Sequence, residues 1–189
     1  TIPELDYFQS PCFEKKFLPP FLGIKSHRVC EQATLPCHIR KDKIDVFLSA
    51  AYIMPLAASC PTVVCIHDIS YQVHPEWFAF RDQLELRGFT FCSVRRAARI
   101  VSCSNHTKRE ILSQYGSRWE SKIRVIYDAP ERHFCAGPGD RIASHYGISQ
   151  PYFLFVGYLF KRRNILLLIR AFKKVLAAYP GYRLVLIGR

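Results

Sequence analysis

The chain has 189 residues, of which 49% are hydrophobic, so it is long and apolar enough to bury a core, and a disordered protein is excluded. The net charge of +12 is unevenly distributed. The first 140 residues carry 18 basic and 15 acidic side chains, a net charge of +3, whereas the residues after Asp140 carry nine basic and no acidic ones. We therefore expect the C-terminal part to bind nucleic acid, acidic lipid or the phosphates of a small ligand.

The cysteines are scattered along the chain. No CxxC pair occurs, which favours reduced, buried thiols of a cytosolic protein over disulfides or a metal site. The first residues lack the pattern of a signal peptide. The eight positions are Cys12, Cys30, Cys37, Cys60, Cys65, Cys92, Cys103 and Cys135.

The N-terminal part alternates between predicted strands and helices. The first 40 residues look like loops and short helices. The predicted strands are "KIDVFLSA", "PTVVCIH", "AARIVSCS" and "KIRVIYDA". Between them lie two predicted helices, "FAFRDQLELRGFTFCSVRRAA" and "NHTKREILSQYG"; Ser104 can cap the second, and Gly116 can end it.

One uncharged stretch, Val46–Ile66, is long enough to span a membrane as a helix. Prolines and polar residues interrupt it, and Pro55 falls near its middle. We therefore predict a strand, a loop and a strand there. "TVVCI", which ends this stretch, indicates a strand buried on both faces.

The C-terminal part reads as a strand, a helix and a strand of the parallel type. "PYFLFVGY" and "YRLVLIGR" are the strands, and the helix has Asn164 as its N-cap and Pro180 as its stop. The predicted buried stripe of the helix is Ile165, Leu168, Ile169, Phe172, Leu176 and Tyr179. Turn residues between Asp128 and Gln150 predict a linker, so we expect a first domain over 1–135, a linker over 136–150 and a second domain over 151–189. A single strand–helix–strand unit cannot cover both faces of its sheet, so we expect an internal fragment of a longer protein.

A basic loop follows the first strand of the second domain. Ligands bind beyond the carboxyl ends of strands in open α/β sheets, and Gly157–Arg163 forms such an end. Lys161, Arg162 and Arg163 stand directly before the helix. Cations at a helix N-terminus cost about 0.3–1 kcal/mol each, unless an anion is bound. We therefore expect a phosphate or pyrophosphate there, although a solvated basic turn is the alternative.

His67 and Asp68 end a predicted strand of the first domain. Buried polar groups cost free energy unless they are satisfied, so these two either bind a ligand or are satisfied by neighbouring backbone groups. As ligand-binding groups, they would face the basic loop across a cleft. His74, Glu76, His106 and His133 are predicted to be loop or surface residues. No set of residues has the spacing of a metal site.

With these segments together, the chain resembles the retaining nucleotide-sugar glycosyltransferases of family 4. These enzymes have the GT-B fold, in which two Rossmann-like units with doubly wound parallel sheets face each other. We expect this α/β fold here, with both units incomplete. The matching segments, in the family's order, are "KIDVFLSAAYIMPL", "PTVVCIHDISYQVHPEWF", "AARIVSCSNHTKREIL", "KIRVIYDAPERHF" and "PYFLFVGYLFKRRNILLLIRAF".

The resemblance assigns roles to site residues. We predict His67 and Asp68 as the catalytic residues, and the resemblance implies that His67 contacts the donor sugar near the reacting carbon. It also implies that the loop after Gly157 holds the donor diphosphate, chiefly through Arg163, where the family usually has Lys. Tyr158 stands where many members have Arg. The predicted diphosphate-binding residues are Gly157, Lys161, Arg162, Arg163 and Asn164.

The resemblance also implies a function. We expect a hexosyltransferase that moves a sugar from a nucleotide-diphosphate donor to a glycan or lipid-linked hydroxyl acceptor in surface polysaccharide biosynthesis. No metal or other cofactor is expected, because protein cations stabilise the leaving group. We expect a cytoplasmic protein with peripheral contact to anionic membrane and no nucleic-acid partner. The family's two glutamates should lie beyond Arg189, so the fragment alone is expected to be inactive. The alternative is a non-catalytic basic α/β module that binds nucleotide, nucleic acid or anionic lipid.

Overall fold

The computed structural model describes residues 12–17, 27–130, 140–148 and 151–188. The chain divides into two compact units, Thr1–Asp128 and Ala129–Arg189, and each is described by itself. The domain boundaries predicted from the sequence stay predictions, since 131–139 lie outside the described residues. A short helix, α5 (Asp140–His145), lies where only a linker was predicted.

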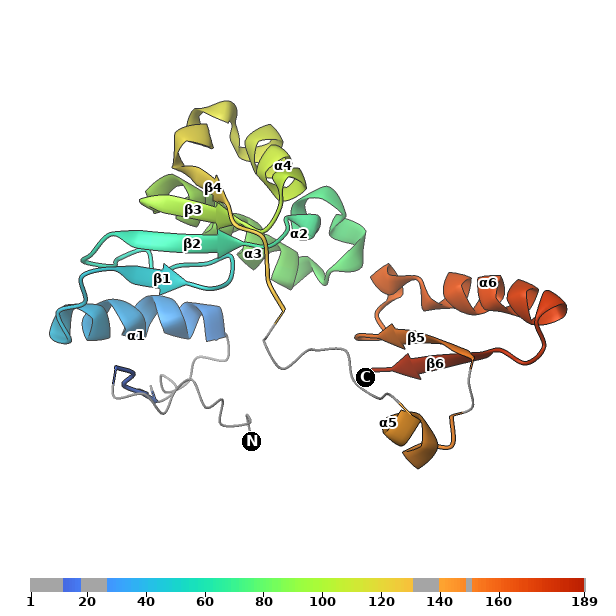
Figure 1. The fold of residues 1–189 in the computed structure, drawn as a ribbon. Helices are drawn as coiled ribbons and strands as arrows, with labels where there is room; N and C mark the ends of the chain where they lie inside the picture. The colour runs from blue at the N-terminus through green and yellow to red at the C-terminus, as the bar shows by residue number, and fades with distance from the viewer. Residues whose placement is uncertain (1–11, 18–26, 131–139, 149–150, 189) are drawn as a thin grey trace. The chain divides into compact units, whose positions relative to one another are not determined.

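The first unit is built on a four-stranded parallel sheet in the order β1-β2-β3-β4 (Figure 1). Its register pairs Val64 with Ile100 and Ile100 with Ile123, so three neighbouring strands place apolar side chains in one row. The strands are β1 (Phe47–Ser49), β2 (Thr62–Ile66), β3 (Arg99–Ser102) and β4 (Ile123–Val125). All four predicted strands of this unit are confirmed.

Helices connect β2 to β3 and β3 to β4, and one helix precedes β1. The two predicted helices are present, and they flank β3 in the sequence. The Ser104 side chain caps α4 by accepting the backbone N–H of Thr107, and Gly116 ends the helix with φ of 104°, as predicted. The helical elements are α1 (His27–Lys41), α2 (Ser70–Val73), η2 (Pro75–Trp77), α3 (Phe80–Arg96), α4 (Asn105–Tyr115) and η3 (Ser117–Lys122).

The longest of the helices that were missed from the sequence is α1. The 15-residue α1 lies where loops and short helices were predicted. It is anchored by tertiary contacts: Gln32 donates to the carbonyl of Met54 and accepts from the N–H of Leu56, and Arg28 bridges to Asp82 and Glu85 of α3.

The core of the first unit lies under one face of the sheet. Thr62, Val64 and Ile66 of β2 are buried, whereas Val63 and Cys65 are half-buried. The prediction that both faces of β2 are buried is therefore wrong for the face that carries Val63 and Cys65. The stretch Val46–Ile66 contains two strands, and no helix in the described ranges is long and apolar enough to cross a membrane. Residues that form the core include Met54, Val64, Ile66, Tyr71, Val94, Ile100, Ile111 and Ile123.

The second unit is the predicted strand–helix–strand. β5 (Tyr152–Val156) pairs in parallel with β6 (Arg183–Ile187), and α6 (Ile165–Ala178) connects them after a short turn, η4 (Lys161–Arg163). The predicted stripe of α6 is partly wrong, because Ile169, Leu176 and Tyr179 are exposed. The half-buried side chains of α6 are Ile165, Leu168, Phe172 and Val175.

Candidate functional site

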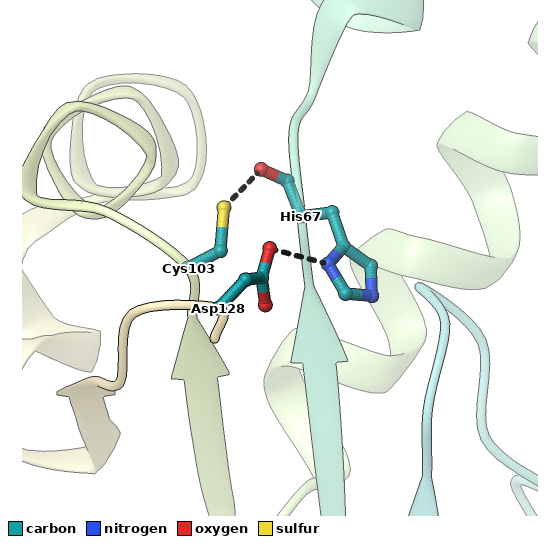
Figure 2. Close-up of side chains that lie close together, drawn as sticks. All are labelled: His67, Cys103 and Asp128. Carbon is teal, nitrogen blue, oxygen red and sulfur yellow. Dashed lines mark hydrogen bonds and ion pairs between the residues drawn. The ribbon is translucent and has the colours of Figure 1, made fainter. Parts of the chain in front are cut away.

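Three neighbouring strands bring polar side chains to the carboxyl edge of the first sheet. His67 follows β2, Cys103 follows β3, and Asp128 lies three residues after the end of β4. Their nitrogen, sulfur and oxygen atoms all lie within 4.8 Å of one another (Figure 2). The strands are parallel and adjacent, so residues far apart in the sequence meet at this edge. Together with apolar residues such as Leu48 and Ile126, they line a cleft of about 340 Å³.

The ring of His67 is oriented by a backbone carbonyl. Nε2 lies 2.8 Å from the carbonyl oxygen of Ala50, and the side chain is 43% exposed. A carbonyl oxygen only accepts, so Nε2 carries the proton and donates. The ring also packs against the ring of Tyr52 in an edge-type arrangement, with 6.0 Å between ring centroids. Neighbouring backbone therefore satisfies one ring nitrogen.

The other ring nitrogen faces a carboxylate. Nδ1 of His67 lies 3.9 Å from Oδ2 of Asp128, beyond hydrogen-bond distance. In the part of the chain that the structure describes, Nδ1 makes no hydrogen bond. Nδ1 is therefore the atom through which His67 can contact a ligand.

The backbone of His67 is tied to the start of α4. Its carbonyl oxygen accepts from Sγ of Cys103 at 2.8 Å and from Oγ1 of Thr107 at 3.0 Å. The backbone N–H of the same residue, Thr107, donates to the Ser104 side chain that caps α4. The capping chemistry of α4 thus fixes the position of the catalytic candidate.

Asp68 holds the loop that follows β2. One carboxylate oxygen accepts from the backbone N–H of Ser70 at 2.8 Å and also from its hydroxyl. The other accepts from the hydroxyl of Tyr52 at 3.0 Å. These bonds give Asp68 a structural role, and its predicted part in catalysis stays a prediction.

In the second unit, two glycines shape the turn after β5. Gly157 has φ of 148°, a conformation that suits glycine, and its N–H bonds to the carbonyl of Ile187. A Cβ added at Gly188 would lie 1.8 Å from the carbonyl oxygen of Gly157. The turn can therefore approach the end of β6 closely only because residue 188 has no side chain.

The predicted diphosphate-binding cations lie in η4. Lys161, Arg162 and Arg163 are exposed, and none of them makes an ion pair within the described ranges. Tyr158, which stands where many members of the family have Arg, stacks on Phe160 with 5.2 Å between centroids.

Asn164 occupies the N-cap position of α6, as predicted, but its side chain makes no capping bond. That part of the prediction is wrong, because Asn164 has left-handed backbone angles (φ 51°, ψ 43°), and the usual cap has an extended backbone. Its carbonyl accepts from the N–H groups of Leu167 and Leu168.

The remaining histidines and cysteines fit their predicted settings in part. His74 stacks on Trp77 and faces Glu76, and His106 faces Glu110, all near the surface. His133 and Cys135 lie outside the described residues. Of the thiols, Cys12, Cys37 and Cys92 are exposed and not buried as predicted, while Cys30, Cys60, Cys65 and Cys103 are half-buried. Burial and the charge of Asp128 raise the pKa of Cys65.

The sequence did not point to Cys103 or Asp128. A signal was present, since each lies at the carboxyl end of a predicted strand, as His67 does. The predicted site residues fall into two groups: His67 and Asp68 in the first unit, and Gly157 with Lys161–Asn164 in the second. Their predicted approach across a cleft stays a prediction.

A parallel α/β unit with polar side chains at its carboxyl edge defines a Rossmann-like ligand-binding protein. Residues 9–129 match the family model described as Glycosyltransferase Family 4. This match covers more than half of the 189 residues, and the chain therefore belongs to glycosyltransferase family 4. The predicted family and the Rossmann-like GT-B fold class are thereby confirmed, and a sugar donor and an acceptor are the partners in general terms. A search of curated proteins finds no match.

Proposed function

We propose that this chain belongs to a retaining hexosyltransferase that moves a sugar from a nucleotide-diphosphate donor to a hydroxyl acceptor on a glycan or lipid. The proposed setting is surface polysaccharide biosynthesis in the cytoplasm, with peripheral contact to the inner face of an anionic membrane. The observation that carries the proposal is the family match over 9–129 together with the position of His67 at the carboxyl edge of that matched unit.

The setting of His67 supports a contact with the donor sugar. Its ring is fixed by Ala50, so Nδ1 is presented in one orientation at the cleft of about 340 Å³. With Nε2 protonated, Nδ1 of the neutral ring accepts a hydrogen bond from a sugar hydroxyl. A fixed acceptor loses little entropy when the sugar binds.

The charge of the second unit supports a diphosphate partner. Lys161, Arg162 and Arg163 are exposed cations without an ion pair among the described residues. In the proposed reaction, the bond between the sugar carbon and the diphosphate breaks, and the diphosphate leaves with the electron pair. The acceptor oxygen bonds to the same carbon, and its proton passes to the leaving diphosphate. Negative charge grows on its oxygens, and we propose that Arg163, with its two neighbours, stabilises that charge in place of a metal ion.

Calorimetry with UDP, GDP and ADP tests the donor part of the proposal. The protein is the product of the whole open reading frame that encodes these residues. We expect one of the three diphosphates to bind best, and Arg163→Ala to weaken its binding about tenfold, the equivalent of one charge-assisted hydrogen bond. Lys173→Ala is the matched control, because Lys173 is an exposed cation on α6 beyond the turn.

A transfer assay with a labelled sugar nucleotide tests the catalytic part. We expect His67→Ala to abolish most of the turnover while it leaves diphosphate binding nearly unchanged. Equal affinity for all three nucleotides, with binding that weakens steeply as salt is raised, would instead indicate a nucleic-acid or lipid-binding module and would overturn the proposal.

A further inference from the structure

We infer that His67, Cys103 and Asp128 form a binding site for a borderline divalent cation of the Zn²⁺ class. The three side chains offer one nitrogen, one sulfur and one oxygen within 4.8 Å of one another (Figure 2). Zinc takes this mixture of donors, usually with four ligands, and a water molecule would complete the set. The sequence pointed to no metal site, because the three residues come from the ends of three different strands.

The orientation of the His67 ring is that of a metal ligand. Metal-binding histidines generally donate their second ring N–H to a carbonyl or carboxylate, which fixes the tautomer. Nε2 of His67 does this to Ala50 at 2.8 Å. Nδ1 then carries a lone pair, and it points toward Asp128.

That lone pair faces an acceptor without a donor between them. Nδ1 of His67 and Oδ2 of Asp128 are 3.9 Å apart, and with the ring proton on Nε2 neither Nδ1 nor the carboxylate oxygen can donate. A doubly protonated ring would instead form an ion pair with Asp128. Two ligands of one tetrahedral zinc lie about 3.3–3.8 Å apart, given zinc–ligand bonds of about 2.0–2.3 Å. A cation between the two atoms would replace their repulsion by two bonds, and it would require only a small decrease in the distance between them.

The geometry disfavours a nucleophilic cysteine paired with histidine. Sγ of Cys103 points to the backbone carbonyl of His67 rather than to the ring. When a cation binds, the thiol proton leaves to solvent and the thiolate becomes a ligand. The Thr107 hydroxyl, 3.7 Å from Sγ, can then donate to the thiolate as an outer hydrogen bond in place of its bond to the His67 carbonyl.

A bound cation has a consequence for the enzyme. It would occupy Nδ1, the atom that contacts the donor sugar in the proposed transfer, so zinc would inhibit the reaction. This consequence rests on the proposed function, whereas binding of the cation does not. Binding is therefore tested by a spectroscopic signal that needs no turnover.

The probe is Co²⁺ alone, added to the full chain kept reduced with a phosphine. We expect one equivalent to give a thiolate-to-cobalt charge-transfer band with the visible bands of tetrahedral cobalt, and Zn²⁺ to displace it. Cys103→Ser should abolish the charge-transfer band. Asp128→Asn and His67→Ala should each weaken binding about tenfold or more, the loss expected for a ligand.

Cys92→Ser is the matched control, since Cys92 is an exposed thiol on α3 outside the cluster. Circular dichroism shows whether each variant is folded. If Cys103→Ser fails to fold, Asp128→Asn decides, because that side chain is 75% exposed. The inference is overturned if no saturable binding occurs, if the band persists in folded Cys103→Ser, or if binding is as tight in Asp128→Asn as in the parent.

Discussion

The contact between Asp68 and Tyr52 can be measured by a double-mutant cycle. Asp68→Asn keeps one acceptor oxygen for Ser70 and replaces the other, which accepts from the Tyr52 hydroxyl at 3.0 Å. Tyr52→Phe removes the same bond from the other side. A net intramolecular hydrogen bond is worth about 1 kcal/mol, so each variant should lower the unfolding free energy by about that amount. The double variant should also lose about 1 kcal/mol and not 2.

The assay is urea unfolding followed by tryptophan fluorescence. Both tryptophans, Trp77 and Trp119, belong to the first unit, so the signal reports the unfolding of that unit. Asp68→Ala removes three hydrogen bonds and should lower the unfolding free energy by about 2–3 kcal/mol. The expected loss per bond is at the low end of the usual range, because the carboxylate is partly exposed. Additive losses in the double variant would show that Asp68 and Tyr52 do not interact, and the part of the structural role that rests on Tyr52 would be refuted.

Variants at two further positions, Ser104 and Tyr71, are measured in the same way. Ser104→Ala removes the cap of α4 and should lower the unfolding free energy by about 1 kcal/mol, while Ser104→Asp restores most of it; no loss in the alanine variant would contradict the capping bond. Burial raises the pKa of Tyr71 well above its usual value of 10.0. Because the unfolded phenol ionises first, the unfolding free energy should fall as the pH rises above about 10, and Tyr71→Phe should make that fall shallower. Equal slopes for the parent and the variant would refute this reading.

Local chemistry explains which elements could be predicted from the sequence. The ends of α4 follow from a serine and a glycine whose effects act within a few residues. The helix α1 was missed because it contains Pro36 and has no acidic residue in its first turn. Its side chains Arg28 and Gln32 are held by partners more than 20 residues away, and no local pattern indicates such contacts.

The candidate site was predictable only in part, for a related reason. His67 and Asp68 are adjacent in the sequence and follow an apolar run, so they draw attention. Cys103 and Asp128 each look ordinary in their own segments. They join His67 only through the strand order of a parallel sheet, and Cys103, the nearer of the two in the sequence, is 36 residues from His67. Strand order was not inferred from the sequence.

The polar residues at the end of β2 can be explained by where their hydrogen bonds go. The Asp68 carboxylate is satisfied by the loop, the His67 carbonyl by α4, and Nε2 by Ala50. These bonds offset the cost of placing polar groups beside a buried strand. Nδ1 of His67 is left without a hydrogen bond among the described residues, at the cleft that His67 and Asp128 line. A sugar hydroxyl and a metal ion would both use the single lone pair of Nδ1, so they exclude each other. A transfer reaction that zinc inhibits in the parent but not in Cys103→Ser would show that the sugar and the metal ion bind the same atom.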